Sequence, residues 1–243
     1  MICLDFDGVL FDSANEAFVI GCKAFFGDDA NFDNLKVNYK RFLLLRPFID
    51  SAWQYRIVFN LLIDDLSDEV MLIKGKKKLM GYPQKEDREF AVKFNCIRTE
   101  LLNNNRSKWI DLHKPYDFFQ LLKPLIKDFP DQFHICSTKG TEFILEILSA
   151  HGLDFDIKQV WGRDAFEANN NSKAAILENN ANLHDTILFV DDSPRHINDV
   201  QCLKNVEAIL AKWGYLEIGK ISDNHTFIIE KIRELLTNND NKN

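Results

Sequence analysis

Two aspartates, one residue apart, directly follow a short apolar run at the start of the sequence. The run Ile2–Leu4 is typical of a buried strand, and Asp5 and Asp7 come directly after it. Side chains two residues apart point to the same face of a strand, so we expect the two carboxylates to lie together. Gly8 comes next, and a glycine permits the sharp turn with positive φ that a chain makes on leaving a sheet. The pattern predicts a carboxylate cluster at the C-terminal end of the first strand.

Other apolar segments further along the chain also end in polar residues. Strands are expected at Phe133–Cys136, Val160–Trp161, Ile187–Val190 and Val206–Ala211, with helical patterns between them. This alternation predicts an α/β fold with a parallel sheet, whose strands all present their C-terminal ends at one edge. The polar residues expected at that edge are Asp5, Asp7, Ser137, Thr138, Gly162, Arg163, Asp164, Asp191 and Asp192.

Carboxylates gathered at one edge repel one another unless a cation lies among them. Ligation by oxygen alone suits Mg²⁺, which is therefore the expected cofactor. Beside such an ion, Asp5 is expected to attack phosphorus as a covalent nucleophile. Asp7, two residues on, would give a proton to the leaving oxygen and later take one from water. The hydroxyl of Ser137 and the ammonium of Lys173 are expected to hold the phosphoryl oxygens.

Four short motifs resemble those of the haloacid-dehalogenase-like (HAD) superfamily and occur in that family's order. DFDGVLFDS is similar to the first motif, HICSTKG to the second, Lys173 to the third and ILFVDDSP to the fourth. The resemblance implies a Rossmann-like core and an aspartyl-phosphate formed on Asp5. It also implies that Mg²⁺ is held by Asp5, Asp192 and the main-chain carbonyl of Asp7, with Asp191 close by, directly or through water.

The second motif leaves its hydroxyl residue open. Aligning the motif on Lys139 places Ser137 as the hydroxyl and Thr138 where members similar to phosphoglycolate phosphatase have asparagine. A register shifted by one residue would give the role to Thr138. We prefer Ser137, and we expect Ser137, Thr138, Lys139 and Gly8 to bind the substrate.

The third motif also has two candidates. The interval from Lys173 to Asp191 is shorter than the family pattern implies, and the usual proline does not follow the lysine. Lys158 is the alternative, but it precedes a strand and would lie on the wrong side of the sheet, so Lys173 is preferred. His196, two positions into a helix, is expected at the surface or behind the site and is assigned no role.

The segment between the first and second motifs has helical periodicity throughout. Ser13 and Glu16 have the spacing of a capping box that begins its first helix. The basic run Lys74–Lys78 is predicted to be a loop. The segment resembles the HAD family's helical cap. The predicted limits are a helical cap at 14–107, a catalytic core at 1–13 and 108–237, and a disordered tail at 238–243.

Composition narrows the classes of partner and compartment. A net charge of −7 and a pI near 5.4 argue against nucleic acid or an anionic membrane as a partner. Five cysteines without a CxxC pair indicate neither a disulfide framework nor a zinc site. The sequence contains no apolar run of about 18 residues and leaves no room for a signal segment before the first strand, so a cytoplasmic protein is expected.

Many of the 20 phenylalanines have helical spacing, which predicts a core filled by rings. The oligomeric state stays open.

The function predicted from these residues is a Mg²⁺-dependent phosphatase that hydrolyses a small phosphorylated metabolite. A haloacid dehalogenase does not need Asp7, which counts against that activity. A phosphonate hydrolase would need a cap lysine, and a sugar phosphomutase would need a cap that handles a bisphosphate. The run Lys74–Lys78 keeps both alternatives open. A non-catalytic binding module with the same fold is the remaining alternative.

Overall fold

The computed structural model describes residues 1–27, 32–180, 186–217 and 219–240 of the chain. It divides into two compact units, one formed by Met1–Asp12 and Lys114–Asn243 and the other by Ser13–His113. The domain limits predicted after residues 13 and 107 stay a prediction. The last helix continues to Asp240, which corrects the predicted tail for residues 238–240, while residues 241–243 lie outside the described residues.

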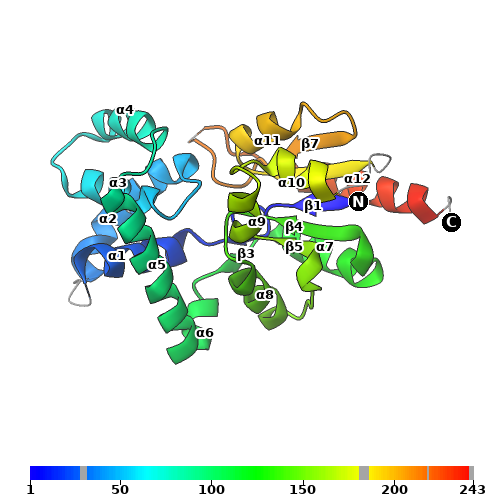
Figure 1. Ribbon diagram of the computed structural model, residues 1–243, viewed down its shortest axis with the longest axis horizontal. Helices are drawn as coiled ribbons and strands as arrows, with labels where there is room; N and C mark the ends of the chain where they lie inside the picture. Colours follow the sequence, from blue (N-terminus) through cyan, green and yellow to red (C-terminus); the bar gives the residue numbers. More distant parts are fainter. Residues whose placement is uncertain (28–31, 181–185, 218, 241–243) are drawn as a thin grey trace. The chain divides into compact units, whose positions relative to one another are not determined.

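A five-stranded parallel sheet forms the centre of the first unit, in the order β5-β4-β1-β6-β7. Its strands are β1 (Ile2–Leu4), β4 (Phe133–Cys136), β5 (Val160–Trp161), β6 (Ile187–Asp191) and β7 (Val206–Leu210). In β1, Leu4 pairs with Ile135 on one side and with Val190 on the other. Figure 1 shows β1, in blue, among strands that lie far along the chain. The predicted parallel α/β sheet is confirmed.

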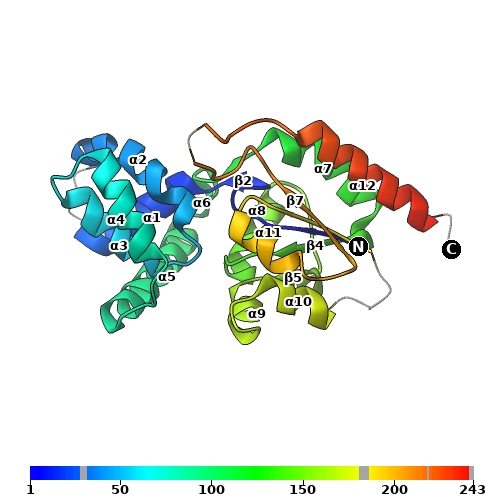
Figure 2. The same ribbon diagram turned by 90° about the horizontal axis from the view of Figure 1, so that it is seen from above.

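Helices cover both faces of this sheet. They are α7 (Asp117–Asp128), α8 (Thr141–Ala150), α9 (Arg163–Ala168), α10 (Lys173–Asn180), α11 (Pro194–Val200) and α12 (His225–Asp240), with short 3₁₀ turns η2 (Pro130–Gln132) and η3 (Ile157–Gln159). Figure 2 shows α7 and α12 on one side of the sheet and α9 and α10 on the other. Parallel strands covered on both faces are apolar along their whole length, as β1 is.

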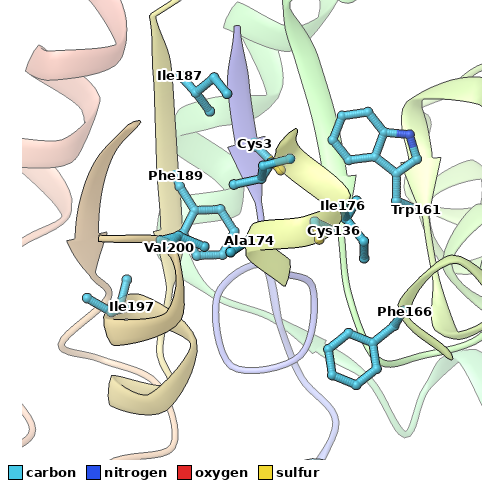
Figure 3. Close-up of a cluster of buried hydrophobic side chains, with 11 residues drawn as sticks. Cys3, Cys136, Trp161, Phe166, Ala174, Ile176, Ile187, Phe189, Ile197 and Val200 are labelled. Atoms are coloured by element: carbon cyan, nitrogen blue, oxygen red, sulfur yellow. The ribbon is translucent and has the colours of Figure 1, made fainter. Parts of the chain in front are cut away.

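One hydrophobic cluster joins the sheet to α9, α10 and α11 (Figure 3). Strand side chains at alternate positions, such as Cys3, Ile187 and Phe189, meet Ala174 of α10 and Val200 of α11 there. Because α10 and α11 pack on this cluster, their first residues are held near the C-terminal edge of the sheet. The packing therefore fixes where the residues at the start of each helix lie.

A two-stranded antiparallel ribbon joins β2 (Phe11–Asp12) to β3 (Lys114–Pro115). Asp12 and Lys114 are paired in it, and they are the residues at which the chain leaves the first unit and returns to it. Strands of two residues carry no periodic pattern, so the sequence did not predict this ribbon. The ribbon belongs to the first unit and ties the two crossing points together.

The second unit is helical. It contains α1 (Ala14–Phe26), α2 (Phe32–Leu45), η1 (Arg46–Phe48), α3 (Gln54–Ile63), α4 (Asp68–Leu79), α5 (Lys85–Asn104) and α6 (Arg106–Ile110). Aromatic rings fill its interior, with centroids 5.3 Å apart for Phe18 and Phe42 and 5.0 Å apart for Tyr55 and Phe94. The prediction of a core built from rings is confirmed for this unit.

The predicted capping box at the start of α1 is wrong. The Ser13 side chain makes no capping hydrogen bond to α1. Glu16 is instead fully buried and accepts two hydrogen bonds from Arg98, at 2.6 and 2.9 Å, and one from Trp109 Nε1 at 3.2 Å. A buried carboxylate needs such partners, and residues 82 and 93 positions away supply them.

The predicted loop at Lys74–Lys78 is also wrong, because this run lies inside α4. The helix begins at Ser67, whose side chain accepts a hydrogen bond from the Val70 amide. Gly75 is buried where α4 crosses α2, and a Cβ there would overlap the side chain of Leu45. The glycine is explained by this close crossing of two helices, and lysine has a good helix propensity.

Within the described ranges, no helix combines the length and the apolar character that crossing a membrane requires. All five cysteines lie in those ranges and carry free thiols. Cys3, Cys22 and Cys136 are buried, whereas Cys96 and Cys202 are exposed.

Candidate active site

A tight turn follows β1 and carries the first two candidate residues. The Asp5 amide donates to the Val190 carbonyl at 2.8 Å, which extends the pairing of β1 with β6 by one residue. The chain then reverses, and the Gly8 amide donates to the Phe11 carbonyl at 2.8 Å. Gly8 has φ +87°, and a Cβ there would overlap the Asp192 carboxylate. The predicted positive-φ turn is confirmed, and glycine is required for both its angle and its space.

The two carboxylate oxygens of Asp5 have different hydrogen-bond partners. Its Oδ1 accepts from the Phe6 amide at 2.7 Å and lies 3.1 Å from Lys173 Nζ. Among the described residues, no hydrogen bond reaches Oδ2, and Asp5 keeps 7% of its surface exposed. Burial raises the pKa of Asp5 to about 6, although the Lys173 ammonium acts to lower it. This geometry orients Oδ2 as the oxygen that could react.

Lys173 is fully buried between two carboxylates. Its Nζ lies 2.6 Å from Asp191 Oδ2 as well as 3.1 Å from Asp5 Oδ1. Burial acts to lower the pKa of Lys173, but Asp191 and Asp5 raise it above its ordinary value. An ammonium between the two acids offsets the repulsion between them.

Asp191 has both oxygens engaged. Oδ1 accepts from the Ser193 amide at 2.8 Å, and Oδ2 contacts Lys173 and, at 3.1 Å, Nδ1 of His196. Burial acts to raise the pKa of Asp191, yet Lys173 and His196 hold it below its usual range. His196, which the sequence left without a role, is thus a buried neighbour of the site. Its position one turn after the double aspartate is a signal that could have found it.

Lys173 is the first residue of α10, and the start of that helix is held by α11. Ser172 Oγ accepts from the Ala175 amide at 3.1 Å, as an N-cap side chain does. Asp199 Oδ2 in turn accepts from Ser172 Oγ at 3.0 Å and from the Ala174 amide at 3.1 Å. The competing candidate, Lys158, has an exposed side chain in η3.

The second motif lies next to Asp7. Lys139, with a buried side chain, places Nζ 3.2 and 3.4 Å from the two carboxylate oxygens of Asp7. Ser137 is buried after β4, and its Oγ accepts from the Lys139 amide at 3.4 Å. Thr138 is half-buried. The structure therefore brings Lys139 to the predicted acid/base residue, a contact that the sequence did not predict.

Asp192 lies against the turn after β1. Its Oδ2 accepts from the Tyr215 amide at 2.5 Å. Glycines at 8 and 214 leave it room, because a Cβ at either position would overlap it. The segment around Tyr215 was not among the predicted site residues, since it follows β7 and carries no acidic or hydroxyl cluster at the strand end.

The donor set fits a hard divalent cation. Asp5 offers a second oxygen, and a cation beside it would offset the burial that raises the pKa of this carboxyl. Ligand atoms of Asp5, Asp191 and His196 also lie within 4.8 Å of one another. However, Lys173 and the Ser193 amide already engage both oxygens of Asp191. Asp191 is therefore a poorer candidate for a direct ligand than Asp5, whose Oδ2 accepts no hydrogen bond from the described residues.

Comparison with known proteins identifies the fold. No protein-family model matches the sequence, and no curated protein matches it. Solved structures do match. A predicted phosphatase from Clostridium acetobutylicum is 17% identical with a TM-score of 0.53, and a predicted phosphoglycolate phosphatase from Haemophilus somnus is 16% identical with a TM-score of 0.55; in both, 96% of this chain and 97% of the other are covered. A haloacid dehalogenase-like family hydrolase from Streptococcus pneumoniae is 14% identical over 95% of this chain and 97% of its own, with a TM-score of 0.50.

This chain has the HAD-like fold. The identities are low, so the likeness extends to the architecture and not to the substrate. The parallel sheet and the carboxylate at the end of β1 were both expected from the residues themselves.

Proposed function

We propose that this protein is a Mg²⁺-dependent phosphatase of the HAD-like type, which hydrolyses a small phosphorylated metabolite through an aspartyl-phosphate on Asp5. The observation that carries the proposal is the asymmetry of Asp5. Lys173 and the Phe6 amide engage Oδ1, while Oδ2 is left to attack. A nucleophile held in this way needs little reorganisation before it reacts.

In the first step, Asp5 Oδ2 bonds to phosphorus while the bond from phosphorus to the ester oxygen breaks, and Asp7 gives its proton to that oxygen. In the second step, Asp7 takes a proton from water, whose oxygen attacks the phosphorus and releases Asp5 and phosphate. The ammonium of Lys139, 3.2 Å from Asp7, would stabilise the anion that Asp7 becomes between the two steps. Lys139 would thereby favour proton donation to the leaving oxygen.

Asp5, Asp192 and the main-chain carbonyl of Asp7 would hold the Mg²⁺ ion. When bound, the ion would neutralise charge on the phosphoryl oxygens. Asp191 would act mainly by fixing Lys173, because the contacts described above engage both of its oxygens. This differs from a direct metal-binding role for Asp191.

Ser137, Thr138, Lys139 and Gly8 remain the proposed contacts to the phosphoryl group. Of the two hydroxyls, we favour Ser137. The helical unit, Ser13–His113, remains the proposed cap that selects the substrate. Free thiols and the acidic composition agree with a cytoplasmic protein that acts on a small molecule, without nucleic acid or membrane as a partner.

The test is a phosphate-release screen over a broad panel of phosphorylated metabolites with Mg²⁺. We expect release from at least one ester, and loss of that release with a chelator or in Asp5→Asn. Asp154→Asn is the matched control, because Asp154 is exposed and lies outside the site. Phosphate release by Asp5→Asn at the wild-type rate would exclude the proposed mechanism.

A further inference from the structure

The segment Trp213–Tyr215 follows β7 and makes hydrogen bonds to separate parts of the first unit. Trp213 Nε1 donates to the Val9 carbonyl at 3.1 Å, in the turn after β1. The Tyr215 amide donates to Asp192 Oδ2 at 2.5 Å, and the Tyr215 hydroxyl donates to Asp12 Oδ1 at 2.9 Å. One short segment therefore contacts the catalytic turn, the fourth motif and the last residue of the unit's N-terminal part.

Close packing at Gly214 shows how tightly this segment is fitted. A Cβ there would lie 2.6 Å from Asp192 Oδ2 and would overlap the Gly8 carbonyl oxygen. A Cβ at Gly8 would also overlap the Asp192 carboxylate. Asp192 is thus packed closely against Gly8 and Gly214 and accepts a hydrogen bond from the Tyr215 amide, which restricts the directions in which its carboxylate can point.

Aromatic packing anchors the segment to the body of the unit. The Trp213 ring has its centroid 4.7 Å from that of Phe118 in α7 and 4.1 Å from that of His225 at the start of α12. Trp213 is also buried. Two side chains, Trp213 and Tyr215, therefore fix the peptide that lies between them.

We propose that Trp213–Tyr215 is a latch that positions the metal-binding carboxylate of Asp192, with Tyr215 and Trp213 as positioning residues. The inference rests on the proposed function, because it takes Asp192 as a ligand of Mg²⁺. Groups that hold a metal ligand from behind set its orientation, and their loss weakens metal binding. The Tyr215 hydroxyl also ties the latch to Asp12, which pairs with Lys114 at the crossing points of the chain.

The latch is tested by calorimetric measurement of the Mg²⁺ dissociation constant in folded variants. Gly214→Ala pushes a methyl group into Asp192 and is expected to weaken Mg²⁺ binding about 10- to 100-fold. Tyr215→Phe removes one hydrogen bond and keeps the ring and the amide, so we expect binding about two- to tenfold weaker. Phosphate release by Tyr215→Phe should recover at saturating Mg²⁺, which a purely structural defect would not allow.

Two matched variants serve as controls. Tyr82→Phe removes a hydroxyl from a residue that is 91% exposed, and Gly81→Ala adds a methyl group in the helical unit; both should bind Mg²⁺ as the wild type does. Circular dichroism establishes that each variant is folded. If Gly214→Ala does not fold, Tyr215→Phe decides the question.

Wild-type Mg²⁺ affinity in a folded Gly214→Ala or in Tyr215→Phe would overturn the latch, and so would a wild-type protein that binds no Mg²⁺. Its failure is distinct from failure of the proposed function. If the variants lose Mg²⁺ affinity but no ester is hydrolysed, the phosphatase proposal fails and the latch stands. If an ester is hydrolysed while Mg²⁺ affinity is unchanged in the variants, the latch fails and the phosphatase proposal stands.

Discussion

Lys173→Met would remove a buried ammonium and keep most of the apolar stem of the side chain. In the wild type, Nζ lies 2.6 Å from Asp191 and 3.1 Å from Asp5, and no part of Lys173 is exposed. Removing one partner of a buried ion pair costs about 3–5 kcal/mol, because the remaining charge is left without compensation. Two carboxylates lose a partner here, so we expect the free energy of unfolding of the first unit to fall by about 4 kcal/mol at pH 8.

The loss should depend on pH. Burial already raises the pKa of Asp5 to about 6, and without Lys173 it rises further, while the pKa of Asp191 rises from its lowered value. An acid whose pKa is higher in the folded than in the unfolded protein favours folding when protonated, and this contribution is lost as the pH rises through the folded pKa. The deficit of Lys173→Met should therefore be smaller at pH 5 than at pH 8.

Urea unfolding measures the change in the free energy of unfolding. A chelator is added to the buffer so that no divalent ion replaces the lost charge. With an m value of about 2 kcal/mol per molar urea, the midpoint at pH 8 should fall by about 2 M. Two units need not unfold together, so hydrogen exchange of peptides from β4 and β6 should report on the first unit alone.

Lys158→Met is the matched control, since the Lys158 side chain is exposed and the same atoms are removed. It should leave the midpoint where it is in the wild type. A Lys173→Met midpoint equal to that of Lys158→Met, or a deficit that does not change between pH 5 and pH 8, would refute the electrostatic account of Lys173.

Three further predictions concern other parts of the chain. Arg98→Met leaves the buried Glu16 without the guanidinium that lies 2.6 Å away, and should lower the free energy of unfolding of the helical unit by about 3–5 kcal/mol. Hydrogen exchange of peptides from α1 and α5 in urea measures this, and an unchanged urea midpoint would contradict it. Asp199→Ala removes the carboxylate that accepts hydrogen bonds from Ser172 and Ala174 at the start of α10, and should lower the free energy of unfolding of the first unit by about 1 kcal/mol. The same experiment on the first unit measures this, and an unchanged stability would contradict the role of Asp199. Burial raises the pKa of Cys22 to about 12, so iodoacetamide at pH 8 should label the exposed Cys96 far faster than Cys22. Mass spectrometry measures the two labelling rates, and equal rates would contradict this prediction.

Local patterns were sufficient for the sheet. Short, mostly apolar runs coincide with β1, β4, β5, β6 and β7, because strands in the interior of a parallel sheet are buried on both faces. The edge strand β7 is less buried and contains the exposed Glu207. Alternation with helices then implied parallel pairing and a shared C-terminal edge. This is why the carboxylates at the ends of β1 and β6 could be expected near one another from sequence.

Local patterns failed where a residue had both a near and a distant partner. Glu16 has capping-box spacing from Ser13, yet it pairs with Arg98, since a buried carboxylate gains more from a guanidinium than from a helix-end amide. Lys74–Lys78 has the composition of a loop, yet its glycine is a close contact between two helices. In both places the deciding contact is remote in sequence.

The sequence by itself determined the α/β order of elements and the polar residues at the strand ends, because periodicity and strand termini are local properties. The tertiary structure alone decided which atoms face each other: Lys173 between Asp5 and Asp191, Lys139 beside Asp7, and the Tyr215 amide on Asp192. These contacts depend on how α10 and the segment after β7 pack against the sheet. Side-chain direction follows from that packing, which no local spacing encodes.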